Sequence, residues 1–161
     1  MTSISVGLAE IKFSRNPDDI IIAHGLGSCV GVAIYDTSCK LGGMIHVVLP
    51  SSSIQKDFAT TPERFADTGI PVLLNKFLLL GGKVATSFVK IAGGANMFQY
   101  NNMSSLDIGG RNIVAVKETL SKYHIVPTSE DVGGCNGRTF SIQIATGKVF
   151  SRMIGMKERE I

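Results

Sequence analysis

The sequence lacks the features that mark membrane-spanning, secreted and nucleic-acid-binding proteins. Only 18% of its residues are charged, the formal net charge is +3, and no block rich in lysine and arginine occurs, which argues against a nucleic-acid partner. The longest apolar stretch, around residues 72–80, is interrupted by Asn75 and Lys76, so we expect no membrane insertion. The first residues show no basic segment followed by an apolar core, so no secretory signal is visible.

Cysteine is scarce as well. Cys29, Cys39 and Cys135 form no C-x-x-C pair, which argues against a structural zinc site. With no visible export signal, we expect a cytoplasmic protein with free thiols. The 161 residues contain 44% hydrophobic side chains and no internal repeat, which predicts a single folded domain over residues 1–161.

Glycine, by contrast, is abundant, with 18 residues that often come in pairs and mark tight turns. Apolar and β-branched residues predict strands over 30–36 and 44–49, joined into a hairpin by the turn segment TSCKLGG. A further strand is expected over 84–92. Residues 140–144 alternate between apolar and polar before a Thr-Gly turn at 146–147, which predicts a second hairpin.

Two helices are expected between these strands. The Thr-Pro pair at 61–62 predicts the start of a helix that ends at the glycine pair 81–82. Pro71 either kinks this helix or starts a second one capped by Thr68. Apolar spacing over 110–123 predicts an amphipathic helix. Strands before, between and after two helices predict an α+β fold with mixed sheets.

The stretch GLGSCVG at residues 25–31 is the main candidate for chemistry. Its glycines loosely resemble a dinucleotide-binding fingerprint, but a strand pattern follows them and residues 44–50 hold no carboxylate. Alternatively, Cys29 is a nucleophile on a glycine-flanked turn, with His46 of the returning strand as its base. The competing interpretation is a buried structural cysteine and a core histidine, because the sequence does not fix which face of its strand His46 uses.

The other cysteines and histidines are weaker candidates. Cys39 lies in a polar turn and is interpreted as an exposed bystander, and no base is evident near Cys135. His24 is an alternative base, although its position beside the glycine turn favours a side chain that points away from Cys29 or covers the site. His124 ends a helix, where a cation offsets the helix dipole.

In their order along the chain, these segments resemble the CheD family, the chemoreceptor glutamine deamidases of bacterial chemotaxis. The resemblance covers roughly residues 5–153 and is carried by GLGSCVGVAIYD, GGMIHVVLPSS, RFADTGIPVLL, IAGGANMF, IGGRNIVAV and DVGGCNGR…ATGKV. It implies an α+β fold, a β-sandwich of mixed sheets flanked by helices, similar to the catalytic domains of glutamine-deamidating toxins. It also implies hydrolysis of selected glutamine side chains to glutamate on methyl-accepting chemoreceptors, and CheC, a phosphatase, as a partner.

The same resemblance assigns the catalytic roles to Cys29 and His46. The family pattern expects a threonine where this chain has Ala23, so we expect a backbone carbonyl at or near Ala23 to orient the imidazole instead. Backbone amides around Gly27 and Ser28 are expected to stabilise the oxyanion. This thioester chemistry needs no metal and no organic cofactor.

A catalytically weakened binding module is the alternative interpretation. In that case Met97, Phe98 and Tyr100 contribute to an apolar surface for receptor helices or for a CheC-like phosphatase. Fast, selective alkylation of Cys29 with a depressed thiol pKa would favour the enzyme, and slow, unselective alkylation would favour the binding module.

Overall fold

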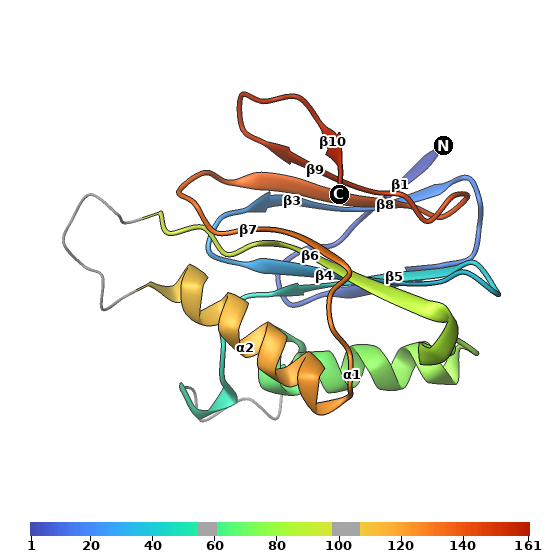
Figure 1. Cartoon of the computed structure of the whole chain (residues 1–161), viewed down its shortest axis with the longest axis horizontal. Coiled ribbons are helices and arrows are strands. Elements are labelled where there is room, and N and C mark those ends of the chain that lie inside the picture. Colours follow the sequence, from blue (N-terminus) through green and yellow to red (C-terminus); the bar gives the residue numbers. More distant parts are fainter. Residues whose placement is uncertain (55–60, 98–106) are drawn as a thin grey trace.

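Within residues 1–54, 61–97 and 107–161, which the computed structural model describes, the chain forms two five-stranded sheets and two α-helices (Figure 1). The outer sheet contains, in spatial order, β1 (Thr2–Ser5), β3 (Asp19–Leu26), β8 (Arg138–Gln143), β9 (Val149–Met153) and β10 (Arg159–Glu160). The central sheet contains β2 (Ile11–Ser14), β5 (Leu41–Val47), β4 (Val30–Asp36), β6 (Ser87–Gly93) and β7 (Ser129–Val132). The helices are α1 (Ala66–Leu79) and α2 (Ile108–Lys122).

The two sheets stack face to face, and both helices cover the other face of the central sheet (Figure 1). Neighbouring strands are mostly antiparallel, but β1 with β3 and β6 with β7 are parallel pairs. The predicted α+β sandwich of mixed sheets flanked by helices is therefore confirmed.

The strand β4 is buried on both of its faces. Val30, Val32 and Ile34 pack against the helices, whereas Ala33 and Tyr35 face the outer sheet. A strand covered on both sides needs apolar residues at every position, which is why this segment is a continuous apolar run in the sequence.

Both predicted hairpins form, with β4 antiparallel to β5 and β8 antiparallel to β9. The first strand covers the predicted residues 30–36, but β5 already begins at Leu41. Gly42 and Gly43 therefore belong to the strand, and their assignment to the turn was wrong. A Cβ on Gly43 would collide with the Phe13 ring, so this glycine is required for packing across the sheet.

The first helix starts later than predicted. Residues 62–64 form a separate 3-10 turn, and α1 begins at Ala66. Thr68 lies inside the first turn of α1, where its hydroxyl donates to the Pro62 carbonyl at 2.6 Å, so it caps no second helix. Pro71 is accommodated within α1, in its second turn.

The remaining element ends follow local backbone chemistry. α1 ends before Gly81, whose φ of 90° suits a residue without a side chain. Residues 84–86 form a 3-10 turn, so the strand expected over 84–92 starts only at Ser87. The amphipathic helix expected over 110–123 is confirmed as α2, and Asp107 caps it with a hydrogen bond from the Gly110 N–H to its carboxylate.

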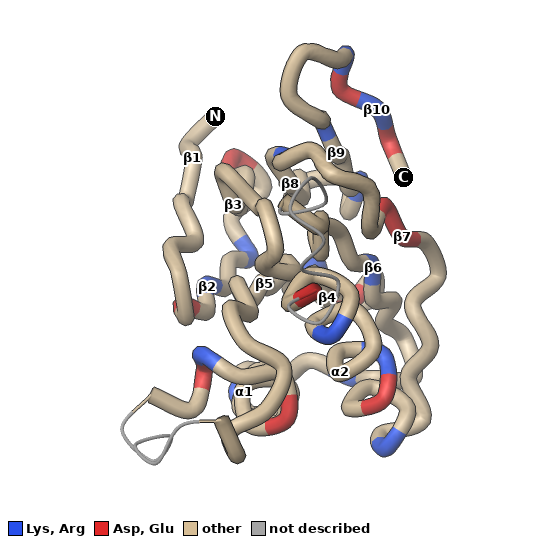
Figure 2. The backbone as a smooth tube through the Cα atoms, turned by 90° about the vertical axis from the view of Figure 1, so that its left-hand side faces the viewer, with Lys and Arg blue, Asp and Glu red and all other residues tan. Residues whose placement is uncertain are grey.

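The charged residues of the described chain are interspersed rather than gathered by sign (Figure 2). Of the helices in the described ranges, none has the length and apolar character needed to cross a membrane.

Candidate active site

A short loop between β3 and β4 presents Cys29. Gly25, at a φ of 63°, lies in a β-bulge near the end of β3, and such a bulge redirects the chain into the loop. The carbonyl groups of the next three loop residues are engaged by the segment that follows β6 and by a side chain of α2. Gly27 O accepts from the Ala95 N–H at 2.8 Å, Ser28 O from Asn112 Nδ2 at 2.8 Å, and Cys29 O from the Gly94 N–H at 2.8 Å.

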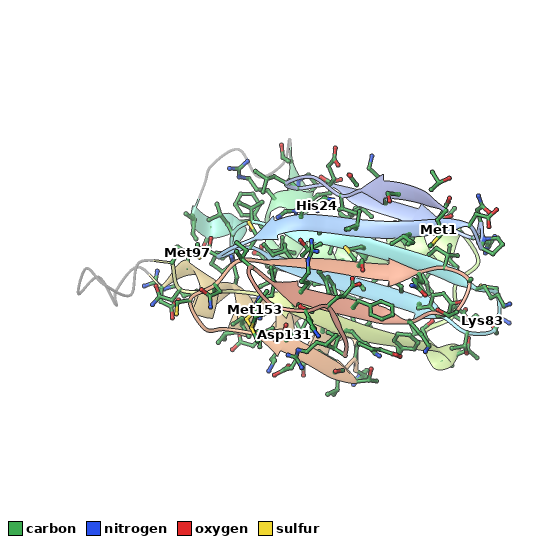
Figure 3. All side chains as sticks on the ribbon, turned by 90° about the horizontal axis from the view of Figure 1, so that it is seen from above. Met1, His24, Lys83, Met97, Asp131 and Met153 are labelled. Carbon is green, nitrogen blue, oxygen red and sulfur yellow. The ribbon has the colours of Figure 1, made fainter. Side chains whose placement is uncertain are left out.

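The amide groups of this loop remain available. Among the described residues, the N–H groups of Gly27, Ser28 and Cys29 donate no hydrogen bond to another residue. Met97 packs beside them, with its Cγ 3.5 Å from the position that a Cβ on Gly27 would take. Met97 lies at the opposite end of the molecule from Lys83 (Figure 3), so the loop belongs to the Met97 end of the sandwich.

His46 faces the space between the two sheets. Met44, two residues before His46, and Val48, two residues after it, both pack in the inter-sheet core, as does Cys29. Side chains alternate along a strand, so His46 and Cys29 share one face of the central sheet. The structure thereby answers the question that the sequence left open.

A backbone carbonyl fixes the orientation of the imidazole. Nδ1 of His46 lies 3.1 Å from the Val6 carbonyl oxygen. Because a carbonyl oxygen only accepts, Nδ1 carries the proton in neutral His46 and Nε2 keeps its lone pair. Nε2 is buried and has no hydrogen-bond partner among the described residues.

The orienting acceptor is the carbonyl of Val6 rather than that of Ala23 itself, where a backbone carbonyl at or near Ala23 was expected. Ala23 pairs with Phe140 of β8 inside the outer sheet, and its backbone groups serve that ladder. Val6 lies next to it because its N–H donates to the Ile22 carbonyl at 2.8 Å. The segment after β1 thus supplies the orienting group beside Ala23.

Cys29 and His46 flank Gly31. Gly31 pairs directly with His46 across the β4–β5 ladder, which makes Cys29 a diagonal neighbour of the histidine. Diagonal neighbours lie about 7–8 Å apart at Cα, within reach of longer side chains. The structure thus brings the two residues to one face of the sheet. It contains no hydrogen bond between the Cys29 thiol and the His46 imidazole, because Nε2 has no partner among the described residues.

Both side chains are largely buried, and burial dominates their protonation. Burial raises the pKa of the Cys29 thiol, an effect that the Arg64 guanidinium and the residue's own N–H oppose. Burial lowers the pKa of His46, against the Val6 hydrogen bond and the charge of Glu10. Both shifts favour the neutral forms at pH 7, so the depressed thiol pKa expected of a preactivated nucleophile is not found.

The other candidates lie elsewhere. His24 is exposed on β3 and lies on the outer sheet (Figure 3), whereas the adjacent Ala23 is buried in the inter-sheet core, so His24 points away from that core. Cys39 follows the opposite end of β4 from Cys29, and Cys135 is exposed. His124 is exposed directly after α2.

Two further points concern partners and metals. Phe98 and Tyr100, named for an apolar docking surface, lie outside the described residues. Within the described ranges, no group of three or more His, Cys, Asp or Glu side chains is placed to hold a metal ion.

The sequence patterns assigned no role to three residues around the site, Val6, Arg64 and Asn112, although Arg64 and Asn112 lie within the segments RFADTGIPVLL and IGGRNIVAV. Val6 and Arg64 come from segments with no catalytic pattern, and only tertiary pairing brings them to the site. Asn112 gave one signal, because it lies on the buried face of α2, one turn before Val116. A polar side chain on an apolar helix face calls for a specific hydrogen-bond partner.

The fold and the site together define a class: a sheet-on-sheet sandwich with a cysteine and an oriented histidine in the inter-sheet space. A family model described as CheD chemotactic sensory transduction matches residues 48–153. A relative from Clostridium botulinum (strain Hall), named "Probable chemoreceptor glutamine deamidase CheD", is 43% identical over 159 residues, or 98% of this chain and 97% of the relative. The chain belongs to the CheD family.

Two other comparisons add breadth. A relative of the same name from Symbiobacterium thermophilum is 39% identical over 158 residues, which cover 98% of this chain and 96% of that protein. The crystal structure of the hypothetical protein YfiH from Bacillus licheniformis is similar with a TM-score of 0.52 and 13% identity, over 78% of this chain and 51% of that one. This second likeness concerns the fold alone.

Proposed function

We propose that this protein is a chemoreceptor glutamine deamidase, which hydrolyses the side-chain amide of selected glutamines on methyl-accepting receptors to give glutamate. The names of near-full-length relatives support the reaction. The observation that carries the proposal is the arrangement of Cys29 and His46 on one inter-sheet face, with Nε2 of His46 open as a proton acceptor.

The reaction begins with a proton transfer. Nε2 of His46 takes the Cys29 proton, while Nδ1 keeps its proton on the Val6 carbonyl. The thiolate then attacks the Cδ carbon of the substrate glutamine and forms a C–S bond. Protonated His46 gives its proton to the departing nitrogen, and ammonia leaves. Water, deprotonated by His46, cleaves the thioester, which releases glutamate and restores the thiol.

Because Cys29 and His46 are both neutral before substrate binds, the thiolate and the imidazolium must be stabilised during the reaction itself. Because burial raises the thiol pKa and lowers the imidazole pKa, the charged pair forms only as the reaction proceeds. The amides of Gly27, Ser28 and Cys29, which donate to no other described residue, are the proposed oxyanion donors, and one such donor lowers the barrier by about 3–4 kcal/mol. The Arg64 charge also favours the thiolate. Substrate binding draws the thiol toward Nε2, as is common where catalytic hydrogen bonds are long in the free enzyme.

The proposal extends to partners and location. Chemoreceptors are the substrates, and a CheC-like phosphatase is the proposed regulatory partner. The three free cysteines suit the reducing cytoplasm. The alternative function is a binding module that docks on the same partners without catalysis, which the raised pKa of the Cys29 thiol favours.

The decisive experiment is mass spectrometry of receptor peptides after incubation with the protein, because deamidation replaces an amide by a carboxyl group. We expect conversion with the wild-type chain and with Cys39→Ala and Cys135→Ala, and none with Cys29→Ala. Full conversion by Cys29→Ala would overturn the mechanism. Unchanged peptides with a cognate receptor and wild-type protein that still binds it would establish the binding module instead.

A further inference from the structure

Asn112 of α2 connects two segments of the site by hydrogen bonds. Its Nδ2 donates to the Ser28 carbonyl at 2.8 Å and to the Val48 carbonyl at 2.9 Å. Ser28 immediately precedes Cys29, and Val48 lies two residues after His46. The side chain therefore bridges the loop of the proposed nucleophile and the strand of the proposed base.

The orientation of this amide follows from its partners. Both acceptors are carbonyl oxygens, so only the NH₂ group satisfies them, and its two hydrogens are both used. Oδ1 is buried and has no hydrogen-bond partner within the part of the chain that the structure describes, and the residue has no exposed surface. A buried acceptor without a partner is destabilising and offsets part of what the two donated hydrogen bonds contribute to fold stability.

The N-terminal turn of α2 also contacts the Cys29 loop indirectly, through the backbone of Gly94 and Ala95. A Cβ on Gly109 would collide with the backbone oxygens of Gly94 and Ala95, which shows how closely the helix approaches. The N–H groups of Gly94 and Ala95 in turn donate to the Cys29 and Gly27 carbonyls. The helix start and the Cys29 loop thus form one packed unit, with Asn112 as its direct hydrogen-bonding link.

We propose that Asn112 is a positioning residue, which keeps the Cys29 loop in register with the His46 strand so that thiol and imidazole meet when substrate binds. This inference rests on the proposed deamidase function. Asn112 touches backbone oxygens and not the reacting atoms, so it acts through the geometry of the pair. Loss of such a positioning residue lowers the rate of the chemical step and leaves substrate binding intact.

The test compares Asn112→Ala and Asn112→Asp with Thr119→Val. The aspartate keeps the size of the side chain but replaces the donor group with an acceptor. Thr119 is a matched control because it is also buried on α2, and its hydroxyl donates only to the Ala115 carbonyl of its own helix, at 2.7 Å. We expect both Asn112 variants to lose about 100-fold in kcat on receptor peptides with KM within about twofold, and Thr119→Val to keep both constants.

Two outcomes decide against the inference. In the first, the kcat of the Asn112 variants lies within about twofold of that of Thr119→Val. In the second, the loss of kcat is proportional to the loss of Tm in all three variants. If wild-type protein deamidates nothing, the proposed function fails, and the positioning role is judged by alkylation of Cys29 in folded protein. Loss of the hydrogen bond to the Ser28 carbonyl of the loop should then raise the iodoacetamide rate on the order of tenfold in the Asn112 variants alone. An unchanged rate refutes the link.

Discussion

Replacing Gly31 with alanine probes the space between the proposed nucleophile and its base. The added methyl group would lie 2.7 Å from Phe140 Cδ1 and 3.2 Å from Leu26 Cδ1. Both neighbours are fully buried, so neither has room to withdraw. Overpacking of this kind costs about 1–3 kcal/mol, while the stiffer unfolded chain offsets about 0.4–1 kcal/mol. A net loss of about 1–2 kcal/mol lowers Tm by about 2–8 °C in a chain of this size.

Gly42→Ala is the matched control for this change. Gly42 pairs with Tyr35 at the other end of the β4–β5 ladder, and its added methyl would collide with the tip of the Ile144 side chain, which is also fully buried. We expect a comparable loss of Tm but wild-type kcat for Gly42→Ala, against a reduced kcat for Gly31→Ala. Thermal unfolding followed by circular dichroism and the peptide deamidation assay measure the two effects. Wild-type stability and kcat in Gly31→Ala would refute the packing and the site geometry alike.

Two further predictions concern protonation. Arg64→Gln removes a positive charge that opposes the rise in the thiol pKa caused by burial, so the pH profile of Cys29 alkylation should move to higher pH; a profile that stays in place contradicts the assigned interaction. Asp36 is buried, and although burial raises its pKa, hydrogen bonds from neighbouring hydroxyl and amide groups outweigh that effect and hold the pKa well below its ordinary value. A carboxylate with a depressed folded-state pKa contributes stability above its unfolded pKa of about 4, and that stability is lost as pH falls toward the folded value. Asp36→Asn should therefore lower Tm at pH 7 and flatten the dependence of Tm on pH between about pH 2 and 5; equal slopes for both proteins count against this interpretation.

Local patterns predicted the elements whose burial is simplest. The bounds of β4 follow from its continuous apolar run, and α2 from its spacing of apolar residues. The Thr-Pro signal at 61–62 was real but marked a 3-10 turn, because the chain returns to an extended conformation at Phe65 before α1. The glycines at 42 and 43 looked like turn residues because a sequence does not show the aromatic ring that packs over one of them.

The sequence predicted which side chains form the site, but not the tertiary contacts that orient them. Cys29 and His46 stood out because of the glycine turn and the returning strand. The orienting carbonyl did not, since Val6 reaches His46 only through the parallel pairing of β1 with β3. A carbonyl carries no side-chain signature, so no pattern distinguishes Val6 from any other residue. The same holds for the protonation of the thiol, which depends on burial by distant strands.

The burial of the Cys29 thiol also affects how readily this side chain is oxidised. Peroxides attack thiolates far faster than thiols, and Cys29 is 9% exposed with its pKa raised by burial. The neutral thiol is the less oxidisable form of the sulfur, and in the proposed mechanism the thiolate forms only while a carboxamide is bound. Damage by cellular oxidants is directed instead toward the exposed Cys135, whose loss leaves the proposed chemistry intact.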